Sequence, residues 1–110
     1  MGFRGQRDTH IIKLRDHNKI EEARALLRSK SSAGVMGEIL KSRASYNPRW
    51  SYHLKPSSIK FFELAIEVCD ASPKYIEKHL NKVGSDFLPG KIWCPWSSYV
   101  RKEIRRQRRR

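Results

Sequence analysis

The stretch that decides the predicted fold runs Ser58-Ile-Lys-Phe-Phe-Glu-Leu-Ala-Ile-Glu-Val-Cys69. Its apolar side chains would cover most of the circumference of a helix over 58–69, and its polar side chains would fall on one narrow stripe. That stripe consists of Lys60, Glu63, Glu67 and Asp70. A helix that is apolar on most sides belongs at the centre of its domain. The stretch therefore predicts an all-α fold built around this segment.

Two further helices are predicted before this central one. Asn18 followed by Glu21 fits a capping box, which would open a helix that ends near Ser29. A second helix over 33–44 is predicted because its apolar residues recur at the spacing of a buried helical face. These residues are Val35, Met36, Ile39 and Leu40.

Two more helices are predicted after it. Ser72 and Pro73 fit the N-cap and first position of a helix that runs to about Val83. A last helix would begin at Ser97 or Ser98 and continue into the basic C-terminal residues. The complete prediction is a small orthogonal bundle of about five helices with basic termini.

The segment from Glu63 to Leu80 resembles a helix-turn-helix, in which the second helix presents its outer face to the DNA major groove. It departs from that pattern at the turn, where Cys69 and Asp70 stand in place of the usual glycine. The resemblance implies that residues 58–83 contact duplex DNA. The implied contact residues are Ser72, Lys74, Tyr75, Lys78, His79, Asn81 and Lys82. An ordinary αα-hairpin with a solvated lysine face is the structural alternative.

The formal net charge of +13 is unevenly distributed along the chain. Residues 55–90 are neutral overall, whereas residues 91–110 alone carry +7. This distribution is typical of a packed unit with cationic arms. We expect a flexible basic N-terminal arm over 1–9, a single helical domain over 10–100, and an arginine-rich tail over 101–110.

The tail holds seven of the 24 basic side chains of the chain, against one acid. Arginines at this density repel one another unless a polyanion neutralises them, so the tail predicts contact with nucleic-acid phosphates. If about six tail cations each neutralise a phosphate, binding to duplex DNA has a salt slope of about −5. The predicted contacts are Arg101, Lys102, Arg105, Arg106, Arg108, Arg109 and Arg110.

Three aromatic residues precede the tail and are candidates for stacking on exposed bases: Trp93, Trp96 and Tyr99. The alternative is that they pack the last helix onto the core. In a small domain with few aliphatic residues, this packing role is the favoured one.

The two cysteines, Cys69 and Cys94, lie outside any CxxC pattern, which favours reduced thiols in a cytosolic setting. No cofactor or metal site is predicted, because no histidine or cysteine has metal-ligand spacing. A nuclease would need clustered acids or histidines. The sequence brings His53 near Lys55, but at no recognised catalytic spacing.

These observations predict a small DNA-binding regulator or accessory factor rather than an enzyme, with DNA favoured over RNA as its partner. We expect it to be cytoplasmic or nucleoid-associated, or nuclear, organellar or viral in a eukaryote, and not secreted. No apolar run approaches ~20 residues, so no membrane span is expected. Three alternatives stay open: a ribonucleoprotein component, a small nuclease, and a basic inhibitor of an acidic protein. A protein partner or a homodimer is compatible with each.

Overall fold

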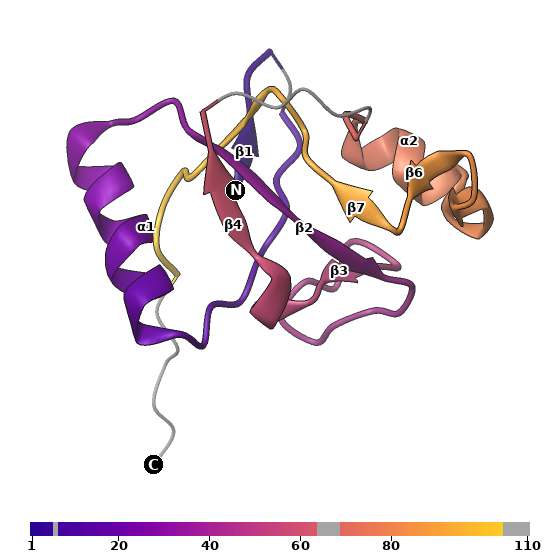
Figure 1. Cartoon of the computed structure of the whole chain (residues 1–110), viewed down its shortest axis with the longest axis horizontal. Coiled ribbons are helices and arrows are strands. Elements are labelled where there is room, and N and C mark those ends of the chain that lie inside the picture. Colours follow the sequence, from indigo (N-terminus) through magenta and orange to yellow (C-terminus); the bar gives the residue numbers. More distant parts are fainter. Residues whose placement is uncertain (6, 64–68, 105–110) are drawn as a thin grey trace.

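A computed structural model describes residues 1–5, 7–63 and 69–104 and shows a mixed α/β fold (Figure 1). Strand β2 (Gly34–Leu40) crosses the centre of the molecule. Three short strands pair with it antiparallel: β3 (His53–Leu54) and β4 (Lys60–Phe62) at its two ends, and β7 (Ile92–Trp93) in its middle. The predicted all-α bundle is therefore wrong.

Strand β2 replaces the helix predicted over 33–44. Its buried residues alternate, with Val35, Gly37 and Ile39 facing the core, which is the period of a strand. Glycine disfavours a helix. At Gly34 a Cβ atom would lie 2.5 Å from the ring of Phe62, so a larger residue there would displace that ring.

Helix α1 (His17–Ser29) confirms the first predicted helix. Its N-cap is Asp16, whose Oδ1 accepts a hydrogen bond from the Asn18 backbone N–H at 2.8 Å, so the predicted capping box is replaced by a simpler cap. Figure 1 shows α1 on one side of the strands. None of its residues is fully buried, so the helix is a peripheral element.

The predicted helix-turn-helix does not form in the described part of 58–83. Residues 60–62 form β4, in which Phe61 pairs with Val35 of β2. Residues 64–68 of the predicted first helix lie outside the described residues. Helix α2 (Pro73–Lys78) keeps the predicted Ser72 cap, which accepts from the Tyr75 N–H. It ends after six residues and continues into the 3₁₀ turn η2 (Leu80–Lys82), too short for a recognition helix.

A disulfide between Cys69 and Cys94 corrects the prediction of reduced thiols. The two Cα atoms lie 5.1 Å apart, and the Cys94 N–H donates to the Cys69 carbonyl at 2.8 Å. The bridge fixes the segment before α2 to the end of β7.

The two ends of the fold lie together. Strand β1 (Gly2–Phe3), from the predicted N-terminal arm, pairs with β8 (Ser98–Tyr99), where a last helix was predicted. The predicted last helix is wrong, since residues 100–104 continue in irregular backbone. Beyond α2, the short strands β5 (Val83–Gly84) and β6 (Phe87–Pro89) pair in parallel.

The core is aromatic. Trp93, Tyr52 and His10 are fully buried, and their ring centroids lie 5.0–5.8 Å apart. The polar atoms of the large rings are paired: Trp93 Nε1 donates to the Ala71 carbonyl, and the Tyr52 hydroxyl donates to the Pro73 carbonyl, both at 2.9 Å. This core therefore joins β2 and its neighbours to the segment that leads into α2.

Candidate functional site

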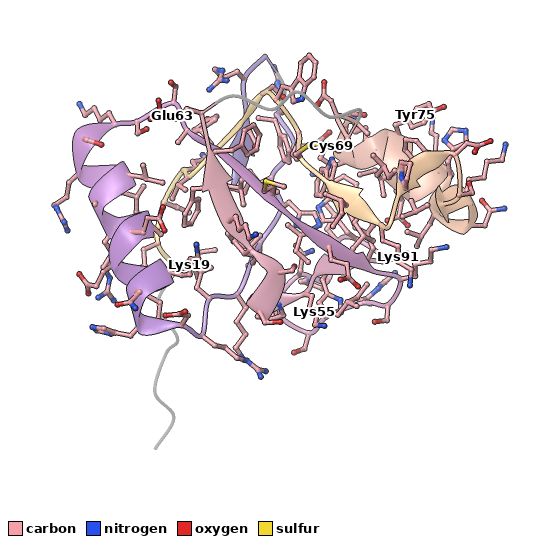
Figure 2. All side chains as sticks on the ribbon, viewed as in Figure 1. Lys19, Lys55, Glu63, Cys69, Tyr75 and Lys91 are labelled. Atoms are coloured by element: carbon pink, nitrogen blue, oxygen red, sulfur yellow. A yellow bond between two sulfur atoms is a disulfide. The ribbon has the colours of Figure 1, made fainter. Side chains whose placement is uncertain are left out.

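A solvent-open pocket of about 900 Å³ lies between the start of α1 and the segments around β3. We refer to it as the basic pocket. Its positively charged lining residues come from three stretches of chain: Lys13, Arg15 and Lys19; Arg43; and Lys55. Tyr46 and His53 also line it. Figure 2 shows Lys19 on α1 and Lys55 near the segment of β3.

The charge balance of the basic pocket is one-sided. Five lysines and arginines face one carboxylate, that of Asp16, which is already engaged as the N-cap of α1. Lys19 pairs with Glu22 at 3.5 Å, while no carboxylate among the described residues pairs with the other four cations. Concave clusters of one sign raise the local concentration of counter-ions, so the pocket attracts anions.

Tyr46 forms part of the pocket wall. Its hydroxyl is buried and has no hydrogen-bond partner among the described residues. The ammonium of Lys13 lies 5.9 Å from the ring centroid, at cation–π distance. Burial raises the pKa of the Tyr46 hydroxyl, an effect that Arg15 partly opposes, so the group remains a hydrogen-bond donor at neutral pH. A buried unsatisfied donor costs about 1–3 kcal/mol, so this hydroxyl lowers the stability of the fold.

His53 stands edge-on to the Tyr46 ring, with the ring centroids 6.1 Å apart. Its Nδ1 donates to the Ser42 carbonyl at 2.7 Å. This bond assigns the proton of the neutral ring to Nδ1 and leaves Nε2 as the atom for contact with a ligand.

Asn47 holds the walls of the basic pocket together. It is buried, and its Oδ1 accepts from the Ile11 N–H at 2.9 Å while its Nδ2 donates to the Tyr52 carbonyl at 3.3 Å. These bonds bring the irregular segment before α1 against the loop between β2 and β3. Lys13 and Tyr46 consequently meet although 33 positions separate them.

The residues assigned to the helix-turn-helix lie elsewhere, on the lobe formed by α2 and η2. Ser72 caps α2, and Asn81 and Lys82 lie exposed on η2. On α2, the Tyr75 ring stacks on His79 with centroids 4.1 Å apart. The neighbouring Lys74 and Lys78 are exposed. The structure thus brings these residues onto one surface, but not onto a groove-reading helix.

The three side chains predicted to stack on bases differ in their exposure. Trp93 is fully buried, and Tyr99 lies in β8 against Gly2, so both are packing residues. Trp96 is 52 % exposed and stays available. In the tail, Arg101 and Lys102 are exposed, whereas residues 105–110 lie outside the described residues and with them Arg105, Arg106, Arg108, Arg109 and Arg110.

The sequence matches the family described as the BP-74 N-terminal domain over residues 2–107. The chain belongs to this family. The match spans both the basic pocket and the α2 lobe, so both are parts of the BP-74 N-terminal domain. No curated protein and no solved structure matches the chain.

The described parts of this BP-74 N-terminal domain hold neither a metal cluster nor a membrane-spanning helix. Within residues 1–5, 7–63 and 69–104, no group of three or more histidines, cysteines or acids is placed to hold a metal ion. Over the same residues, no helix has the length and apolar character needed to cross a membrane.

The basic pocket could not be identified from the sequence because the cations that line it are scattered along the chain. Lys13, Arg43 and Lys55 belong to different segments, and none lies in a charge cluster. The local signals were two pairs of pocket-lining residues, each two positions apart: Lys13 with Arg15, and His53 with Lys55.

Proposed function

We propose that this protein binds nucleic acid and holds its phosphate backbone in the basic pocket. The observation that carries the proposal is the pocket's charge, five cations against one engaged carboxylate. Lysine and arginine contacts to phosphate supply most of the sequence-independent affinity for nucleic acid. The partner class, nucleic acid, is the one predicted from the sequence. The proposed contact surface is now the basic pocket instead of residues 58–83.

The pocket offers chemistry suited to phosphate as well as charge. The guanidinium groups of Arg15 and Arg43 can each donate two parallel hydrogen bonds to a phosphate. Phosphate contacts position a strand without identifying its bases, so this pocket accounts for affinity rather than for sequence preference.

The arginine tail has a supporting role in this proposal. Arg101 and Lys102 leave the fold as exposed cations, and Glu103 is held to α1 by Arg24, whose Nη2 lies 2.9 Å from Glu103 Oε2. We infer that the arginines beyond Ile104 add further phosphate contacts. They should strengthen binding to every nucleic acid alike.

The test compares two double variants that remove equal charge. Arg15→Ala/Arg43→Ala removes two cations from the pocket, whereas Arg28→Ala/Lys60→Ala removes two exposed cations that do not line it. Fluorescence anisotropy with a labelled oligonucleotide should show about tenfold weaker binding for the pocket variant. Its salt slope should fall by about 1.4 for a single strand.

Each variant is measured in the full chain and in a chain that ends at Ile104, so that tail contacts do not hide the loss. The charge-matched control should lose much less affinity. Equal losses in both variants would show that net charge alone drives binding, and would overturn the pocket as the site. Binding that does not depend on salt would contradict the phosphate contact itself.

A further inference from the structure

Two half-exposed aromatic side chains, those of Tyr75 and Trp96, are connected to the segment that begins at Asp70. Among the described residues, the exposed large hydrophobic side chains are Tyr75 at 51 %, Trp96 at 52 % and Ile104 at 60 %. The first two are linked through Asp70, whose Oδ1 accepts from the Trp96 N–H at 2.9 Å. Asp70 and Tyr75 are five positions apart, so these two Cα atoms are at most about 18 Å apart.

The Tyr75 ring and the backbone of Trp96 are held in place. The Tyr75 ring stacks on His79 and meets Phe87 edge-on at 5.3 Å between centroids. His79 Nδ1 donates in turn to the Tyr75 carbonyl at 2.9 Å. The backbone of Trp96 is fixed by its bond to Asp70, and the disulfide of Cys69 ties the same segment to β7. Rigid aromatic surfaces bind flat ligands with a small loss of conformational entropy.

Cations accompany both rings. Arg4 Nη2 donates to the Trp96 carbonyl at 3.0 Å. Arg7 and Lys74 line one concavity together with Ser72, the N-cap of α2. Asp8 in that concavity is engaged by Arg49 at 2.7 Å and lies 4.0 Å from Lys74. The surface therefore combines exposed rings with positive charge, the combination found where single-stranded nucleic acid binds.

We propose that Tyr75 and Trp96 form an aromatic strip that stacks unpaired bases, which makes the nucleic-acid partner single-stranded. This inference rests on the proposed function and identifies its substrate class. In a duplex the flat faces of the bases are covered by their neighbours, so a stacking surface of this kind selects strands whose bases are free. Figure 2 shows Tyr75 toward the opposite end of the molecule from Lys19, so the strip is a site separate from the basic pocket.

The experiment uses the full chain and three labelled ligands of about 15 nucleotides, within the range that one small binding domain covers. They are a thymidine single strand, a strand of the same length with an abasic sugar–phosphate backbone, and a duplex. The thymidine strand should bind at least about tenfold more tightly than the abasic strand, because only the former offers bases to stack. It should also bind more tightly than the duplex.

The variant Tyr75→Ala/Trp96→Ala should lower the affinity for the thymidine strand to that for the abasic strand, and leave the abasic strand and the salt slope unchanged. The variant Tyr75→Phe/Trp96→Phe keeps an aromatic ring at both positions and should retain the preference for the thymidine strand over the abasic strand. Stacking also predicts quenching of Trp96 fluorescence by the thymidine strand, since Trp50 and Trp93 are buried.

The outcomes separate the two proposals. Equal, salt-dependent binding of the thymidine and abasic strands would overturn the aromatic strip and leave the basic pocket in place. Tighter binding of the duplex would also overturn the strip. Loss of abasic-strand binding in the alanine variant would show a structural defect rather than lost stacking, and would count against the strip. If the full chain binds none of the three ligands, both proposals are wrong.

Discussion

The basic pocket and the aromatic strip both carry positive charge, but they present it differently. In the pocket, cations from three segments converge on a concave surface whose single carboxylate is engaged as a helix cap. On the strip, the exposed groups are aromatic rings, and the nearby carboxylate of Asp8 is buried and engaged by Arg49. The pocket is therefore suited to phosphates and the strip to bases.

The two regions also depend on different parts of the fold. The pocket is assembled by Asn47, which bonds to Ile11 and to the Tyr52 carbonyl. The strip lies on a segment that the Cys69–Cys94 disulfide anchors to β7. A change confined to one anchor should therefore affect one region more than the other, and the following predictions use this difference.

The largest expected effect comes from the disulfide. Replacing both cysteines with alanine should lower the free energy of unfolding by about 3 kcal/mol, because the bridge closes a loop between residues 25 positions apart. At a temperature where the variant stays folded, the preference for bases should weaken while binding of the abasic strand persists. Chemical denaturation and anisotropy measure the two effects. An equal loss of both binding modes would contradict the separate anchoring of the strip.

Some elements of the fold could be predicted from the sequence, and others could not. Helix α1 was predictable because its periodicity and its capping region are local signals. Strand β2 was not, since Val35, Met36, Ile39 and Leu40 satisfy a helical spacing as well as a strand pattern, and two glycines were the only contrary signal. Its identity depends on pairing with β4 and β7, which lie far along the chain.

The two candidate sites also differ in how far they could be predicted from the sequence. Tyr75, His79 and Lys74 were predicted as contact residues because they would lie on the outer face of one helix, and in the structure the Tyr75 ring stacks on His79 beside the exposed Lys74. The basic pocket was missed because it depends on a buried side chain, Asn47, that joins distant segments. Nothing in a charge count distinguishes Lys13 or Arg43 from the other cations before the fold is known.

A second prediction concerns the core that both regions share. Burial, followed by the nearby terminal amino group and His53, lowers the pKa of His10 to about 3. Between pH 6.5 and 3 the unfolded chain thus binds a proton that the folded chain does not, so stability falls as the pH falls. The free energy of unfolding should drop by about 2 kcal/mol from pH 6.5 to pH 5, a range above the ordinary carboxylate pKa values.

This acid sensitivity is measured by urea denaturation at several pH values. The variant His10→Gln removes this imidazole, so its stability should change less over the same range. A smaller change should remain in both proteins, because burial and then Arg101 lower the pKa of the Met1 amino group to about 6. Because His10 packs against both Tyr52 and Trp93, acid unfolding should remove pocket and strip together. A wild-type stability that is constant from pH 6.5 to pH 5 would contradict the assignment of His10 as a buried neutral group.

The smallest expected effect concerns Tyr46 and tests whether its hydroxyl binds the ligand or only packs in the wall of the basic pocket. Tyr46→Phe removes a buried hydroxyl that has no partner among the described residues, so the free energy of unfolding should rise by about 1 kcal/mol. The same variant should bind the abasic strand with unchanged affinity, because the buried hydroxyl has no surface that a phosphate oxygen can reach. Stability then rises while affinity stays constant, which is the behaviour of a packing group. A loss of affinity in Tyr46→Phe would show that the hydroxyl contacts the ligand, and a loss of stability would show that it has a partner in the fold.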